Sequence, residues 1–215
     1  MRYQDMNLKL LNFFKSNWNR VISLDLETRV IERQFLKNER ILAISYARRI
    51  NDKFMETEGI ETNTLILQND SIESELELLK KFNTELKQIK PICVVGYGLR
   101  YYDIPLLHLK RRQYNITIWH IVDLIESTFQ VDLYHILKYK KYKKLDDVIS
   151  SDEFSDLPLK KTKDIVSKDK MKKGEDIYKL WKENRKGLIN YIDGDAHDPL
   201  LIIEKLMLEY NEKSQ

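Results

Sequence analysis

Three strand-like segments precede the first long helical pattern of this 215-residue chain, and strand and helix patterns then alternate towards a helical C-terminal region. The strand-like segments are apolar and rich in β-branched residues, and they cover 20–27, 40–50, part of 54–68, 92–98 and 118–125. Helical patterns repeat apolar residues every three or four positions, over 5–19, 71–91, 103–113 and 176–213. Strands that alternate with helices pair in sheets that helices cover. We therefore predict an α/β fold with a mixed sheet of about five strands.

The composition is typical of one folded domain. Apolar residues make up 42% of the chain and charged residues 33%, as in globular proteins that bury a single sizeable core. We expect one domain over residues 1–215, with a helical extension at residues 1–19. The polar residues 150–174 form the best candidate for a mobile loop.

Membrane, secretion and disulfide signals are weak throughout the sequence. The chain has no run of eighteen apolar residues, so we expect no membrane span. Its first residues show neither an apolar h-region nor a small-residue cleavage site. Cys93 is the only cysteine, which excludes an intramolecular disulfide and a thiolate zinc site. We therefore expect an intracellular, cytoplasmic protein.

Two acids interrupt the first strand-like segment, which contains the residues VISLDLET (21–28). Asp25 and Glu27 are two residues apart, so in a strand their side chains lie on the same face. Neighbouring carboxylates repel each other, and burial raises their pKa unless a cation compensates. A hard divalent cation such as Mg²⁺ or Mn²⁺ would make the pair favourable. The alternative is that this strand face is exposed to solvent.

Two later stretches contain acids in positions that favour the metal interpretation. Asp103 follows an apolar strand and a glycine-containing turn, where α/β sheets place functional residues, although it could also be a helix N-cap. Tyr191 and Asp195 are four residues apart and hence on one helix face. We expect Asp193 and Asp198 to lie on other sides of that helix and to meet solvent.

The positive charge of the chain is concentrated in one region. Residues 138–173 contain twelve lysines and seven acids, a net charge of +5 against +3 for the whole chain. Within them, KYKKYKK (138–144) alternates lysines with tyrosines, a pattern that suits a nucleic-acid backbone with bases stacked on rings. A solvated loop or helix face is the alternative.

Three motifs together resemble those of a known enzyme family. The stretches SLDLET, GYGLRYYDIPLL and YIDGDAHDPLLIIEKL are similar to the three motifs of DEDDy-type 3′–5′ exonucleases. The likeness is greatest to the proofreading domain of family-B DNA polymerases and runs in the family's order from about residue 20 to residue 207. The resemblance implies a ribonuclease H-like fold.

By position, the resemblance implies four metal-binding acids, namely Asp25, Glu27, Asp103 and Asp195. It also implies two Mg²⁺ or Mn²⁺ ions, with Asp25 bridging both, and Tyr191 as the tyrosine of the class. The histidine class has a histidine where this chain has Asn190, so the tyrosine class is the better match.

The resemblance further implies a metal-dependent 3′–5′ exonuclease that releases mononucleotides from single-stranded or frayed DNA. Such an enzyme would bind nucleic acid, most often single-stranded DNA, and would act in DNA repair. Candidate contacts with the strand are Tyr101, Tyr102, Lys140, Lys141 and Tyr142.

Two departures from the family leave alternatives open. Gly98 stands where the family's second motif usually has an asparagine that contacts the terminal nucleotides, which puts strand grip and substrate choice in doubt. No polymerase segments follow the third motif, so we expect a stand-alone nuclease. The alternatives are an RNA-directed or structure-selective nuclease of the same fold, and a non-catalytic nucleic-acid-binding subunit.

Overall fold

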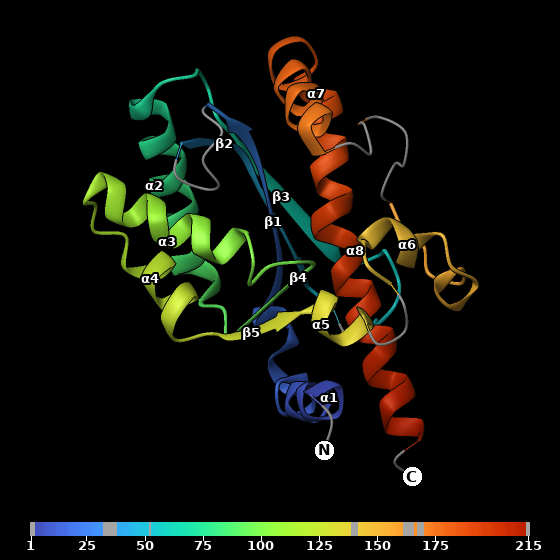
Figure 1. Ribbon diagram of the computed structural model, residues 1–215. Coiled ribbons are helices and arrows are strands. Elements are labelled where there is room, and N and C mark those ends of the chain that lie inside the picture. Colours follow the sequence, from blue (N-terminus) through green and yellow to red (C-terminus); the bar gives the residue numbers. More distant parts are fainter. Residues whose placement is uncertain are drawn as a thin grey trace.

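A five-stranded mixed sheet forms the centre of the computed structural model, which describes residues 3–31, 38–51, 53–138, 142–160, 166 and 170–213 (Figure 1). The strands are β1 (Val21–Val30), β2 (Glu39–Arg49), β3 (Ile60–Ile66), β4 (Cys93–Gly96) and β5 (Phe129–Asp132). Their order in the sheet is β3-β2-β1-β4-β5. The pairs β1–β2 and β2–β3 are antiparallel, and the pairs β1–β4 and β4–β5 are parallel. The predicted α/β fold with a mixed sheet is confirmed.

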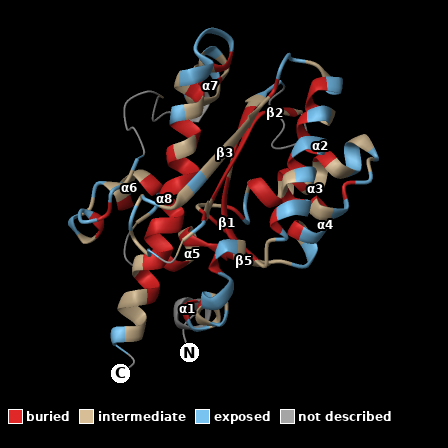
Figure 2. Cartoon of the chain, turned by 180° about the vertical axis from the view of Figure 1, so that it is seen from behind, coloured by how far each residue is buried: buried red, intermediate tan, exposed pale blue. Residues whose placement is uncertain are grey.

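Helices cover both faces of this sheet (Figures 1 and 2). One face carries α2 (Ile72–Ile89), α3 (Asp103–Tyr114) and α4 (Trp119–Glu126), and the long α8 (Arg185–Glu212) crosses the other. Within the described ranges the structure also has the helical segments α1 (Tyr3–Phe13), η1 (Lys15–Arg20), α5 (Leu133–Leu137), α6 (Leu145–Ile149), η3 (Asp152–Phe154) and α7 (Lys170–Glu183). Among the residues that the structure describes, no helix is both long and apolar enough to cross a membrane.

Side-chain alternation along β1 divides the core into two clusters. Val21 belongs to the cluster that contains Leu200 of α8, whereas Ile22 belongs to the cluster that contains Phe82 of α2. Because alternate residues of a strand share a face, Asp25 lies on the same face as Val21. The first acid of the strand therefore points towards α8.

The prediction of a strand at residues 118–125 is wrong, because this segment forms α4 and the fifth strand follows it. Ile118, Ile121 and Leu124 are buried at a spacing of three residues, which is a helical period. The Asn83 side chain accepts hydrogen bonds from the main-chain N–H groups of His120 (2.9 Å) and Ile121 and so satisfies the first turn of α4. A short apolar run allows either period, and this capping contact from α2 is not visible in the local sequence.

Two other segments differ in detail from the prediction. The expected helix at 5–19 is α1 followed by the 3-10 segment η1, with a kink at Asn17. Part of the expected loop at 150–174 is helical, since η3 lies within it and α7 begins at Lys170. Phe154 is fully buried in the cluster beneath α8. The mobility of this stretch stays a prediction.

A buried ion pair attaches α8 to β2. The side chains of Arg49 and Glu204 are both 0% exposed, and Arg49 Nε lies 2.7 Å from Glu204 Oε1. Glu204 also accepts hydrogen bonds from Arg49 Nη2 at 2.8 Å, Trp18 Nε1 at 2.9 Å and the Met55 main-chain N–H at 2.7 Å. Both charges are thus hydrogen-bonded in the interior, which is the condition under which a buried ion pair is tolerated.

Candidate metal centre

β1 extends beyond its parallel neighbour in the sheet. β4 pairs with β1 only over Val21–Ser23, so the part of β1 that carries Asp25 and Glu27 has no strand on that side among the described residues. The main-chain N–H of Leu26 donates a hydrogen bond there to Oδ1 of Asp103 at 3.1 Å. The carboxylate of Asp103 therefore takes the place of a strand partner between the two acids.

Three carboxylates gather on the α8 side of β1. One oxygen from each of Asp25, Glu27 and Asp195 can be chosen so that all three lie within 4.8 Å of one another. Glu27 and Asp195 are buried, and Asp25 is half-buried. The Oδ2 atom of Asp25 is closed off from solvent and accepts no hydrogen bond from the described residues. The structure thus brings together three of the four predicted metal ligands.

Burial and mutual repulsion raise the pKa of Asp25 well above its ordinary value. Desolvation is the largest cause, followed by the charges of Asp195, Glu27 and Asp103. A buried carboxylate oxygen without a hydrogen bond is unfavourable unless a cation is bound next to it. The cluster therefore has the donor atoms and the excess negative charge that suit a hard divalent cation.

Asp103, the fourth predicted ligand, lies beside this cluster on another element. It is the first residue of α3 and is buried, while Tyr102 has the N-cap position. The pKa of Asp103 is raised to about 8, because burial, the largest cause, and the charge of Glu27 raise it more than the hydrogen bond from the Leu26 N–H lowers it. Its Oδ1 accepts the main-chain N–H of Leu26 in β1, so the carboxylate attaches the first turn of α3 to this strand.

Tyr191 and Lys173 complete the surroundings of the acids. Tyr191 is buried on α8, one turn before Asp195, and burial together with the Asp195 charge raises the pKa of its phenol. Lys173 of α7 places Nζ 3.0 Å from Glu27 Oε1 and 5.6 Å from the centre of the Tyr191 ring. Glu27 is the main reason that the pKa of Lys173 is raised. The ammonium group therefore offsets part of the negative charge of the cluster.

Sequence reasoning missed Lys173. The residue lies in the stretch that we assigned to a loop, and it is one of several lysines there. The available signal was the lysine-rich run that precedes the predicted motif of Tyr191 and Asp195 by about eighteen residues.

The acids next to this motif do not both meet solvent, contrary to the prediction. Asp198 is fully buried, where its Oδ1 accepts the Lys160 main-chain N–H at 2.8 Å and lies 2.9 Å from His197 Nδ1. The half-buried Asp193 accepts a hydrogen bond from Ser45 Oγ at 3.3 Å. The prediction for Asp198 is wrong because the segment before Lys160 covers a side of α8 that periodicity alone left open.

The predicted nucleic-acid contacts differ in their surroundings. Tyr101 is 55% exposed, whereas the hydroxyl of Tyr102 is hydrogen-bonded to Glu39 and Thr28. The Tyr142 hydroxyl donates to Glu153 at 3.0 Å. The remaining two candidates, Lys140 and Lys141, lie outside the described residues.

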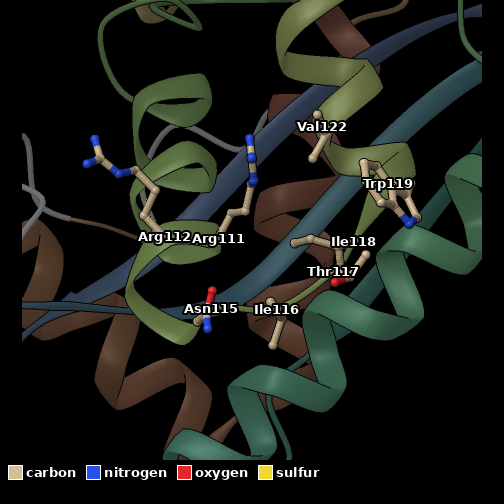
Figure 3. Close-up of a pocket in the computed structure, with 8 residues that line it drawn as sticks. All are labelled: Arg111, Arg112, Asn115, Ile116, Thr117, Ile118, Trp119 and Val122. Carbon is tan, nitrogen blue, oxygen red and sulfur yellow. The ribbon is translucent and has the colours of Figure 1, made fainter.

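A separate hollow lies between α3 and α4, away from the acids (Figure 3). It has a volume of about 380 Å³ and is lined by Arg111, Arg112, Asn115, Ile116, Thr117, Ile118, Trp119 and Val122. Arg111 is eight residues from Asp103 along α3, which corresponds to about 12 Å of helix. None of the predicted site residues lines this hollow.

A metal-free cluster of this kind makes stability depend on pH. The folded-state pKa of Asp103 is about 8 against about 4 in an unfolded chain, so the folded state binds more protons between these values. In a chelator, the free energy of unfolding is therefore expected to fall by a few kcal/mol as pH rises from about 5 to about 8.

Saturating Mn²⁺ at pH 8 is expected to raise the Tm by roughly 5–10 °C.

Thermal unfolding at several pH values, with EDTA or MnCl₂, measures both effects. The same scans with Asp25→Asn are the control, since this variant should lose most of the gain from Mn²⁺. A Tm that Mn²⁺ leaves unchanged at pH 8 would contradict the assignment of a metal site.

The sequence matches the family model described as DNA polymerase family B, exonuclease domain, over residues 12–151. These residues include Asp25, Glu27 and Asp103 but not the Tyr191–Asp195 region. No curated protein sequence matches the chain.

Among solved structures, the fold resembles that of the family B DNA polymerase from the hyperthermophilic archaeon Pyrobaculum calidifontis. The match has a TM-score of 0.64 and 17% sequence identity, and it covers 87% of this chain. The chain spans about a quarter (24%) of the length of that polymerase. The likeness supports the predicted ribonuclease H-like fold. With the family model matched over residues 12–151, the chain belongs to the exonuclease-domain family of family-B DNA polymerases.

Proposed function

We propose that this chain is a metal-dependent 3′–5′ exonuclease that removes mononucleotides from the 3′ ends of single-stranded or frayed DNA. The observation that carries the proposal is the cluster of Asp25, Glu27 and Asp195, in which one oxygen of each lies within 4.8 Å of the others. Within this cluster, Oδ2 of Asp25 is buried and lacks a hydrogen bond from the described residues. A non-catalytic binding module has no use for so repulsive a cluster, because the same carboxylates would be more stable in solvent.

In this proposal Asp25, Glu27, Asp103 and Asp195 hold two Mg²⁺ or Mn²⁺ ions. Such ions, when bound, lower the pKa of a water molecule and neutralise charge that develops on the scissile phosphate. The acids come from three elements, β1, α3 and α8, so the packing of both helices on the sheet determines their relative positions.

Tyr191 is proposed to orient the attacking water and not to deprotonate it. Burial and the neighbouring Asp195 raise the pKa of its phenol, so the hydroxyl stays protonated at neutral pH. A neutral phenol can both donate and accept a hydrogen bond. Lys173 lies close to the same ring and to Glu27, and its positive charge favours the approach of a phosphate group.

RNA is the second candidate substrate because of Gly98. This glycine has a φ of 79°, and a Cβ built on it would meet no atom within 4 Å. This open space lies at the loop that leads to Asp103. Each ribose of an RNA strand carries a 2′-hydroxyl, which a side chain filling that space would exclude. A structure-selective nuclease is the further alternative. The cytoplasmic location and the role in DNA repair belong to the same proposal.

Strands labelled at the 5′ end test the proposal. Single-stranded DNA, duplex DNA and RNA of the same sequence are incubated with Mg²⁺, Mn²⁺ or excess EDTA. We expect stepwise shortening from the 3′ end, fastest on single-stranded DNA, and no shortening in EDTA. Faster digestion of RNA would select the second candidate, and digestion that persists in excess chelator would rule out a metal-dependent nuclease.

A further inference from the structure

Aromatic side chains gather where β4 and β5 end. The Tyr101 ring lies 5.8 Å from the Tyr134 ring, nearly perpendicular to it, and 5.2 Å from the His135 ring at 33°. Tyr134 and His135 are themselves in edge contact at 5.8 Å. We call these three residues the aromatic platform. Tyr101 is 55% exposed, so the platform presents a ring to solvent that is supported from beneath by two others.

One buried carboxylate holds both parts of the platform in place. Asp132, at the end of β5, is fully buried. Its Oδ1 accepts hydrogen bonds from the main-chain N–H groups of Gly98 at 2.8 Å and Tyr134 at 3.0 Å, and its Oδ2 accepts that of Arg100 at 3.0 Å. The loop that carries Tyr101 and the first turn of α5 are therefore attached to the same side chain. Through these hydrogen bonds Asp132 fixes the position of the loop relative to α5.

The platform lies close to the proposed metal centre. Tyr101 is two residues from Asp103, a separation that spans at most about 7 Å of backbone. Stacked nucleotides of one strand are about 3.4 Å apart, so this distance corresponds to roughly two nucleotides. Lys138 adds a positive charge next to the platform, with Nζ 3.4 Å from His135 Nδ1.

We propose that the aromatic platform stacks a base of the substrate strand about two nucleotides before its 3′ end, with Lys138 near the adjoining phosphate. The proposal rests on the exonuclease function proposed above. An exposed ring suits single strands, because every base has a π-face and a duplex keeps its bases stacked on one another. Such a contact holds a strand without reading its sequence, as removal of successive nucleotides requires.

The test uses fluorescence of 2-aminopurine, which falls when this base stacks on a ring. Single strands with phosphorothioate linkages at the 3′ end carry one 2-aminopurine at the first, second, third or sixth position from that end. With wild-type protein and Mn²⁺ we expect the strongest loss of fluorescence at the second or third position. Tyr101→Ala should remove that loss and weaken binding by roughly 5- to 100-fold, whereas Tyr101→Phe should keep both.

Two more variants separate the platform from general effects. Trp119→Ala removes a ring that is 68% exposed in the hollow between α3 and α4, and it should leave fluorescence and affinity unchanged. Asp132→Asn cannot accept the Arg100 N–H through its amide nitrogen, so it should reduce the loss of fluorescence at the same position. Equal fluorescence at all four positions, or a Tyr101→Ala profile identical to that of the wild type, would overturn the proposal.

The proposed function is tested separately with the p-nitrophenyl ester of thymidine 5′-monophosphate. This substrate has a single nucleotide and cannot reach the platform. If the wild-type protein hydrolyses neither this ester nor oligonucleotides, the exonuclease function fails, while the position-dependent fluorescence still decides whether the platform binds a base. If hydrolysis occurs and Tyr101→Ala has the wild-type KM for oligonucleotides, the platform proposal is wrong while the exonuclease function stands.

Discussion

Replacement of Asp25 by asparagine is expected to lower nuclease activity at least about a thousandfold while leaving the metal-free protein as stable as the wild type or more stable. The loss of activity follows because the amide removes a charged ligand from a site whose ions supply several kcal/mol of transition-state stabilisation. The gain in stability follows because burial and three neighbouring acids raise the pKa of Asp25, so its charge opposes folding at neutral pH.

The kcat/KM on a labelled single strand with Mn²⁺ and the free energy of unfolding in EDTA measure the two effects. Asp123→Asn is the matched control, because this aspartate lies on α4 with its side chain 64% exposed, 3.6 Å from His120 Nδ1. It should change neither quantity. An Asp25→Asn protein with activity within tenfold of the wild type, or with clearly lower stability in EDTA, would contradict the assignment.

The second large effect concerns stability. Glu204→Gln leaves the fully buried Arg49 without its counter-charge, and breaking a buried ion pair in this way costs about 3–5 kcal/mol. The amide also loses one of the two oxygens that accept hydrogen bonds from Trp18 and Met55. For a domain of this size the expected fall in Tm is roughly 6–20 °C. Thermal unfolding and urea titration measure it.

Two controls isolate the buried pair. Glu58→Gln removes a partner of Lys53 from a pair that is exposed on both sides, and it should change stability little. The double variant Arg49→Met with Glu204→Leu removes both buried charges and should recover much of the loss. A Glu204→Gln protein as stable as Glu58→Gln would show instead that the interior around α8 tolerates an unpaired arginine.

Much of this architecture could be predicted from local sequence. The acids of β1 interrupt an apolar strand, and the i, i+4 spacing places Tyr191 and Asp195 on one face of α8. Alternation alone could not show whether the acid face of β1 was exposed. Two long-range contacts answer that question. β4 pairs with β1 only over Val21–Ser23, and Asp103 accepts a hydrogen bond from the backbone of β1 beyond that point.

The errors have the same origin. The segment 118–125 is helical, and the side chain of Asn83 of α2 caps its first turn. Asp198 is buried because the segment before Lys160 packs over it. Lys173 was missed since nothing in a lysine-rich stretch distinguishes the residue that reaches Glu27. In each case a contact between residues distant in sequence decided the outcome, and single-sequence periodicity does not contain such contacts.

The central claim is that the acids of β1 and α8 hold divalent cations, and a crystal structure of the protein with saturating MnCl₂ tests it most directly. Anomalous scattering from manganese identifies the ion without ambiguity. We expect a manganese peak whose ligands include Asp25 and Asp195, with Lys173 moved away from the Glu27 oxygen that it contacts at 3.0 Å without metal. The absence of any peak at these acids, with Lys173 still paired to Glu27, would contradict the claim.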